Sequence, residues 1–95
     1  MAVFAYQYTY DSTKTEEMDA IRPLHRGYLG EGAKAGKVLA SGPFAGGKSA
    51  LIIVRFDTAD DAAEFMDQDP FYKHGLVAER VINEWTDVLG AFKGF

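Results

Sequence analysis

The chain has 95 residues, 47% of them hydrophobic, so it is long and apolar enough to form one domain, residues 1–95, around a single core. A net charge of −4 without a lysine and arginine cluster excludes the basic surface that nucleic-acid binding needs. The absence of cysteine excludes disulfides and thiol chemistry, and no apolar run is long enough for a membrane span. We therefore expect a cytoplasmic domain that binds neither nucleic acid nor membrane, and whose small size favours a homodimer.

Residues 2–10 alternate between two faces, which predicts a β-strand. One face carries four aromatic rings, Phe4, Tyr6, Tyr8 and Tyr10. We expect part of this aromatic face to line a pocket or an interface. Plain core packing against helices is the alternative for any single ring.

The sequence of residues 11–34 predicts helical structure in two parts. Thr13 and Glu16 have capping-box spacing, so a short helix can form within residues 11–21. Pro23 would remove a hydrogen bond from a helix interior, so we expect the main helix to begin afresh with Pro23 and to run to about Lys34. In that helix His25 lies beside the apolar face, one turn from the start.

The middle of the chain predicts two strands and a hairpin loop. A short strand covers residues 37–41, the loop covers 44–48, and the strongest strand of the chain covers 49–56. The strongest strand is apolar on both faces, which indicates a central position in a sheet with both faces covered. Thr58 then caps a second helix.

The corner that ends this second helix holds more chemistry than any other stretch. Proline favours an extended residue before it, so Asp69 should lie at a bend, with Pro70 opening a single helical turn that Gly75 ends. Residues 76–86 then predict a strand at a sheet edge or a subunit contact. The apolar residues of the tail, Val88, Leu89, Phe92 and Phe95, are expected to dock against another surface, which again favours a dimer.

These elements follow the order β, α, β, β, α, β, which predicts an α+β, ferredoxin-like βαββαβ fold with an antiparallel sheet. Four pieces in the same order resemble the YCII-related family: Arg22-Pro23-Leu24-His25 with Tyr28-Leu29, Gly36 through Val38-Leu39-Ala40 to Ser41-Gly42-Pro43, Asp69-Pro70-Phe71, and Gly75-Leu76. The resemblance implies a single YCII-like domain forming a dimeric α+β barrel. It also implies an active site built on His25 and Asp69. One activity known in this family is dehydrochlorination of a chlorinated hydroxyquinol.

A histidine held by a carboxylate is a common device for moving protons. We expect His25 to act as acid or base and Asp69 to orient it, the alternative being a buried histidine that Asp69 satisfies structurally. The expected substrate-binding residues are Arg22, Ser41, Gly42, Pro43, Phe71 and Tyr6. Arg22 offers a fork of donors for an anionic or phenolic oxygen, a role that Lys73 can also fill, whereas His74 is expected to be an exposed polar residue.

We therefore expect an enzyme that acts on a small organic molecule by proton transfer, in an elimination, isomerisation or dehydrochlorination, within a mostly aromatic pocket of Phe4, Tyr6, Tyr8 and Phe71. No metal is expected, because the two histidines and scattered carboxylates form no ligand cluster, and no cofactor is expected, because nucleotide-binding fingerprints are absent. The alternatives are a ligand-binding or regulatory module on the same fold that turns nothing over, and a partner protein whose exposed sheet matters more than a cleft.

Overall fold

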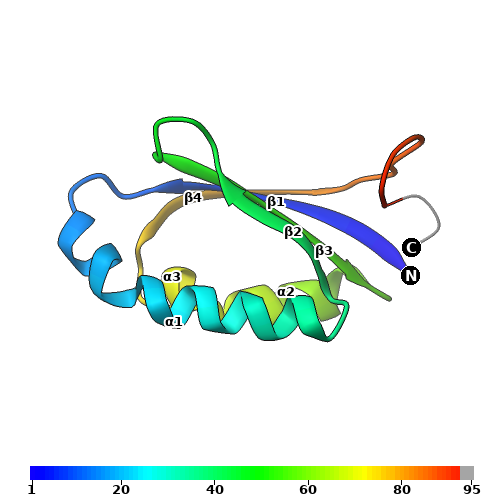
Figure 1. The fold of residues 1–95 in the computed structure, drawn as a ribbon, viewed down its shortest axis with the longest axis horizontal. Helices are drawn as coiled ribbons and strands as arrows, with labels where there is room; N and C mark the ends of the chain where they lie inside the picture. Colours follow the sequence, from blue (N-terminus) through cyan, green and yellow to red (C-terminus); the bar gives the residue numbers. More distant parts are fainter. Residues whose placement is uncertain (93–95) are drawn as a thin grey trace.

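A computed structural model describes residues 1–92 of the protein. The elements are β1 (Ala2–Tyr10), α1 (Thr15–Lys34), β2 (Val38–Pro43), β3 (Ser49–Phe56), α2 (Ala59–Asp67), α3 (Pro70–Lys73) and β4 (Val77–Glu84). The strands form one sheet in the order β2-β3-β1-β4, with every neighbouring pair antiparallel. All three helices lie on one face of this sheet (Figure 1). The predicted ferredoxin-like order is confirmed.

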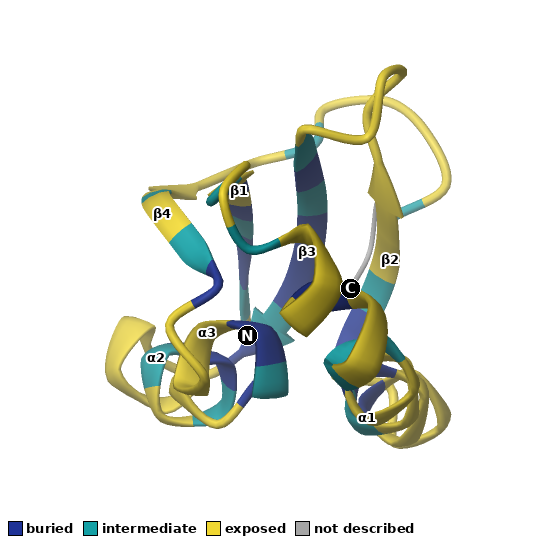
Figure 2. Cartoon of the chain, turned by 90° about the vertical axis from the view of Figure 1, so that its left-hand side faces the viewer, coloured by how far each residue is buried: buried dark blue, intermediate teal, exposed yellow. Residues whose placement is uncertain are grey.

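The core lies between the helices and the two inner strands. Phe4, Tyr6 and Tyr8 of β1 face the helices and are at most 2% exposed. Opposite them in β3 are Val54 and Ile52, which are fully buried. Figure 2 shows that buried residues concentrate on β1 and β3, whereas β2 and β4 are more exposed. The predicted alternation of residues 2–10 and the inner position of β3 are therefore confirmed, although the helices cover only one face of β3.

The prediction that Pro23 starts a new helix is wrong, because α1 continues without a break through Pro23. Proline has no N–H, so the helix loses one backbone hydrogen bond at this point. Pro23 lies on the exposed side of α1, whereas Met18 before it and Leu29 after it are buried. Packing on both sides of the proline holds the segment helical and outweighs the lost bond.

The predicted capping box at the start of this helix is also absent. Lys14 is the N-cap residue, and its side chain makes no capping hydrogen bond. The side chain of Thr13 instead donates to Asp11 Oδ1 at 2.6 Å, in a turn that precedes the helix. The Thr13 hydroxyl therefore stabilises the turn before the helix and does not cap the helix itself.

Gly32 allows α1 to pack closely against α2 and β2. A Cβ atom at Gly32 would lie 2.6 Å from Cζ of Phe65 and 2.8 Å from Cγ2 of Val38. Because an aromatic ring and a β-branched side chain yield little space, we expect Gly32→Ala to lower the free energy of unfolding by about 1–3 kcal/mol. Urea denaturation measures this change.

Gly27 provides the matched control in the same helix. A Cβ atom there would have no neighbour within 4 Å. Since alanine has the higher helix propensity, Gly27→Ala should raise the free energy of unfolding by about 0.5–1 kcal/mol. Equal stability of the two variants would contradict the close packing described for Gly32.

The corner between α2 and β4 has the predicted conformation. The hydroxyl of Thr58 accepts a hydrogen bond from the amide of Asp61 at 3.1 Å and caps α2. Asp69 is the N-cap residue of α3, and Pro70 follows at the first helical position. Gly75 ends the turn with φ +73°, a left-handed conformation that glycine adopts without strain.

The strand β4 lies at one edge of the sheet, as expected for residues 76–86. In the tail, Val88 and Leu89 are 70% and 86% exposed, so these two residues do not dock within the described chain. Phe95 lies outside the described residues. No helix of residues 1–92 is long and apolar enough to cross a membrane.

Candidate active site

Asp69 is a fully buried carboxylate held by three hydrogen bonds. The backbone N–H of Phe71 donates to Oδ1 at 3.2 Å, as expected for an N-cap residue. The Tyr8 hydroxyl donates to Oδ2 at 2.8 Å. His25 Nδ1 lies 2.7 Å from Oδ1. Because a buried carboxylate is costly unless its oxygens are satisfied, these partners explain how the chain tolerates Asp69 in the core.

His25 reaches Asp69 from α1, across 44 positions of sequence. It is 9% exposed, and its ring stacks on Phe71 with centroids 3.9 Å apart and planes 12° apart. An ionised carboxylate only accepts hydrogen bonds, so Nδ1 carries the proton that faces Asp69. In the neutral ring the other nitrogen, Nε2, is then an acceptor. The stacking and the hydrogen bond together fix the direction of Nε2.

Tyr8 completes a chain of three side chains, Tyr8, Asp69 and His25. Burial, followed by the negative charge of Asp69, raises the pKa of the Tyr8 hydroxyl. That hydroxyl stays protonated at neutral pH and donates to Oδ2 permanently. Its effect is to hold the second carboxylate oxygen, so that Oδ1 remains directed at His25.

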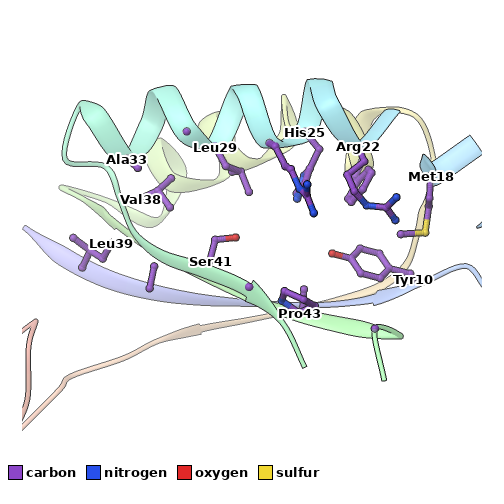
Figure 3. Close-up of a pocket in the computed structure, with 17 residues that line it drawn as sticks. Tyr10, Met18, Arg22, His25, Leu29, Ala33, Val38, Leu39, Ser41 and Pro43 are labelled. Carbon is purple, nitrogen blue, oxygen red and sulfur yellow. The ribbon is translucent and has the colours of Figure 1, made fainter. Parts of the chain in front are cut away.

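His25 borders a cavity of about 610 Å³ between α1 and β2. The side chain points from α1 into this space (Figure 3). Much of the lining is apolar or small, including Met18, Leu29, Val38 and Ala50. A cavity of this size and character is typical of a site for a small organic molecule.

The polar groups of the cavity are mostly donors. Arg22 and Arg26 line it from α1, and Ser41 lines it from β2. Tyr10 lines it from the end of β1. Of the residues that line this cavity none is Asp or Glu. The cavity therefore suits a ligand with oxygen acceptors or negative charge.

Five of the six expected substrate-binding residues line this cavity: Arg22, Ser41, Gly42, Pro43 and Phe71. Arg22 is also paired with Asp19 at 2.6 Å, through Nη1. Neither Lys73 nor His74 lines the cavity. Lys73 donates a hydrogen bond to Gln68 at 3.1 Å instead. The side chains of Lys73 and His74 are both exposed.

Tyr6 is placed elsewhere, and the structure corrects the expectation that it lines the cavity. It lies in the core with 1% exposure, and the guanidinium of Arg80 lies 5.4 Å from its ring centroid. Phe4 and Tyr8 are also core residues outside the lining. The cavity lies beside β2, which forms the edge of the sheet opposite to β4. Of the four aromatic residues on the helix-facing side of β1, Tyr10 lines the cavity and the other three are covered by core packing.

Three polar side chains of the site have positions that were not predicted individually from the sequence: Tyr8 as a partner of Asp69, and Tyr10 and Arg26 as cavity residues. For Tyr8 and Tyr10 the alternating pattern gives the face but not the neighbours. Arg26 follows His25 directly, and the four-residue spacing from Arg22 was the available signal, since it places both arginines on one side of α1. No group of three or more His, Cys, Asp or Glu side chains in residues 1–92 is arranged to hold a metal ion.

The fold and the site together define a ferredoxin-like α+β domain with a buried histidine–carboxylate pair beside an open cavity. The family model of the YCII-related domain matches residues 1–86, and the chain belongs to this family. No curated protein matches the chain in sequence.

Solved structures share the fold at low sequence identity. The chain is similar to 5-chloro-2-hydroxyhydroquinone dehydrochlorinase (TftG) from Burkholderia phenoliruptrix AC1100, solved in complex with 2,5-dihydroxybenzoquinone, with a TM-score of 0.78, 24% identity, and coverage of 88% of this chain and 93% of that chain. An antibiotic biosynthesis monooxygenase has a TM-score of 0.59, 12% identity, and coverage of 94% and 100%. An uncharacterized NIPSNAP domain protein from Burkholderia xenovorans has a TM-score of 0.56, 16% identity, and coverage of 97% of each chain.

Proposed function

We propose that the protein is an enzyme that acts on a small organic molecule by proton transfer, with His25 as the base or acid. The observation that carries the proposal is the 2.7 Å contact between His25 Nδ1 and Asp69 Oδ1, on a histidine that borders a cavity of about 610 Å³. Asp69 fixes the tautomer and stabilises the imidazolium that forms when Nε2 takes a proton. Such a pair needs no group besides the chain's own residues to move a proton.

The reaction type is elimination, isomerisation or dehydrochlorination. In the elimination, Nε2 takes a proton from an O–H or C–H of the substrate, and the electron pair of that bond moves into the substrate. A chloride then leaves with the electrons of its own bond, so the net loss is HCl and no oxidant or reductant is consumed. Support for this type comes from family membership and from the fold shared with a dehydrochlorinase.

The substrate would lie between α1 and β2. Arg22 and Ser41 would bind its oxygens, and Phe71, Gly42 and Pro43 would shape the walls. Glycine removes a side-chain obstruction, so the backbone at Gly42 allows a close approach. The probe that tests the proposal is 5-chloro-2-hydroxyhydroquinone, with chloride release as the measured product.

A ligand-binding or regulatory module without turnover remains the alternative function. It would be indicated if 2,5-dihydroxybenzoquinone raised the melting temperature of the protein while no chloride were released from the chlorinated compound. Steady chloride release that depends on the protein would support the enzyme.

We further propose that the protein is a homodimer that covers the helix-free face of the sheet. Val81 lies opposite Gln7 of β1 and is 44% exposed, and Trp85 next to this strand is 41% exposed. No helix of the described residues packs on this face (Figure 1). Exposed apolar side chains on a sheet face that no helix covers are typical of a subunit contact.

Sedimentation velocity tests the dimer. The expected mass is twice 10.5 kDa, and Val81→Glu should shift the protein toward the monomer because a buried carboxylate opposes association. The matched control is Leu24→Glu, which places a carboxylate at a residue of α1 that is 59% exposed and lies away from the helix-free face, and which should leave the mass unchanged. A monomeric wild-type protein at micromolar concentration would contradict this proposal.

A further inference from the structure

Tyr10 presents an unused hydroxyl to the cavity. The Tyr8 hydroxyl donates to Asp69, and the Tyr28 hydroxyl donates to the carbonyl of Phe65 at 2.7 Å. The Tyr10 hydroxyl has no hydrogen-bond partner within residues 1–92, and it points into the cavity, toward the space between Ser41 and His25 (Figure 3). A half-buried hydroxyl without a partner is a candidate for binding a ligand atom.

The ring of Tyr10 has a fixed relation to His25. Tyr10 meets Phe71 edge to face, with centroids 5.5 Å apart and planes 77° apart. The opposing stack of His25 on Phe71 has centroids 3.9 Å apart. Both rings pack on the same phenylalanine and both residues line the same cavity, so Tyr10 and His25 border a common space.

The Tyr10 hydroxyl is a donor at neutral pH. Burial, with a contribution from the negative charge of Asp69, raises the pKa of Tyr10 to about 12, and the positive charge of Arg22 opposes this shift. Arg22 and Tyr10 line the same cavity, Arg22 from α1 and Tyr10 from the end of β1 (Figure 3). The two groups would both stabilise an anionic oxygen placed between them.

We propose that Tyr10 and Arg22 form an oxyanion subsite opposite His25, and that the substrate is an organic acid of the phenol or enol class that binds through its charged oxygen. The inference rests on the proposed function, because the oxygen bound by Tyr10 and Arg22 belongs to the substrate from which His25 removes a proton. When Nε2 takes a proton from another O–H or C–H of the substrate, the electron pair of that bond moves into the carbon framework and chloride leaves with the electrons of its own bond, while Tyr10 and Arg22 hold the negative charge of the bound oxygen. Arg26, at the same cavity, adds positive charge that favours anions over neutral analogues.

The test compares two ligands of the same ring. 2,5-Dihydroxybenzoquinone has acidic hydroxyls and carries negative charge near neutral pH, whereas 2,5-dimethoxybenzoquinone is neutral. Tyr10→Phe keeps the ring contact with Phe71 and removes only the hydroxyl. Titration calorimetry should show roughly tenfold or greater loss of affinity for the dihydroxy compound and less than twofold change for the dimethoxy compound. Arg22→Gln should show the same pattern.

The matched control is Tyr72→Phe, because Tyr72 is 37% exposed and outside the cavity. It should leave both affinities unchanged. Equal effects of Tyr10→Phe on both ligands, no effect on either, or a wild-type protein that binds neither would overturn the subsite. The proposed reaction fails separately, if the wild type binds the dihydroxy compound selectively but releases no chloride from 5-chloro-2-hydroxyhydroquinone.

Discussion

Replacing His25 with glutamine should lower the rate of chloride release from 5-chloro-2-hydroxyhydroquinone by about 10²- to 10⁴-fold. Glutamine is polar and of similar length, so an amide can still donate to Asp69 Oδ1 where the imidazole does. The amide has no nitrogen able to take a proton near neutral pH. The loss should therefore fall on turnover, with the affinity for 2,5-dihydroxybenzoquinone changed far less.

The other histidine of the chain gives a matched control for this experiment. His74 is exposed at the end of α3 and does not line the cavity. His74→Gln should leave the rate within twofold of the wild type. If His25→Gln also lost less than tenfold in turnover, His25 would not be the group that moves the proton.

Two replacements of Asp69 should separate its part in folding from its part in the reaction. Asp69→Ala leaves Tyr8, His25 and the amide of Phe71 without their common acceptor in the core. Unsatisfied buried donors are costly, so the free energy of unfolding should fall by about 3 kcal/mol or more. Urea denaturation with a fluorescence readout measures this.

Asp69→Asn keeps the shape and most of the hydrogen bonds of the site. Its oxygen can accept from His25 and Phe71, and Tyr8 can turn its hydroxyl to accept from the amide. We expect a loss of about 1 kcal/mol in stability but a fall of about 10²-fold or more in turnover, because the imidazolium loses its counter-charge. Asp60→Asn is the control, since Asp60 is an exposed residue in the first turn of α2. Equal turnover of Asp69→Asn and the wild type would rule out an electrostatic role for Asp69.

The parts of the fold that sequence predicts well are those fixed by local rules. Alternation of apolar residues gives β1, and the Asp69-Pro70 pair with Gly75 gives the corner, because proline and glycine restrict the backbone directly. Pro23 is the opposite case. Its local preference is to begin a helix, and only the packing of α1 on both sides of it decides the outcome, which residues 11–34 alone do not reveal.

The candidate site also has one part that the sequence predicts and another part that it does not. Composition and spacing alone favoured a structural role for His25. The ordered resemblance to the YCII-related family, which pairs His25 with Asp69 across 44 positions, made the catalytic role equally strong. Tyr6, Tyr8 and Tyr10 share one face of β1, so periodicity treats them alike. Their different surroundings, in the core, on Asp69 and in the cavity, depend on where α1 and α2 cross the sheet. That crossing is a property of the tertiary structure and has no local signal.

The most direct test of the proton-transfer site is a crystal structure of the protein soaked with 2,5-dihydroxybenzoquinone. The proposal predicts the ligand between α1 and β2, with one of its oxygens about 2.6–3.2 Å from His25 Nε2 and with Nδ1 still bonded to Asp69. A ligand bound outside this cavity, or bound within it with Nε2 turned away and hydrogen-bonded to the protein, would contradict the assignment of His25.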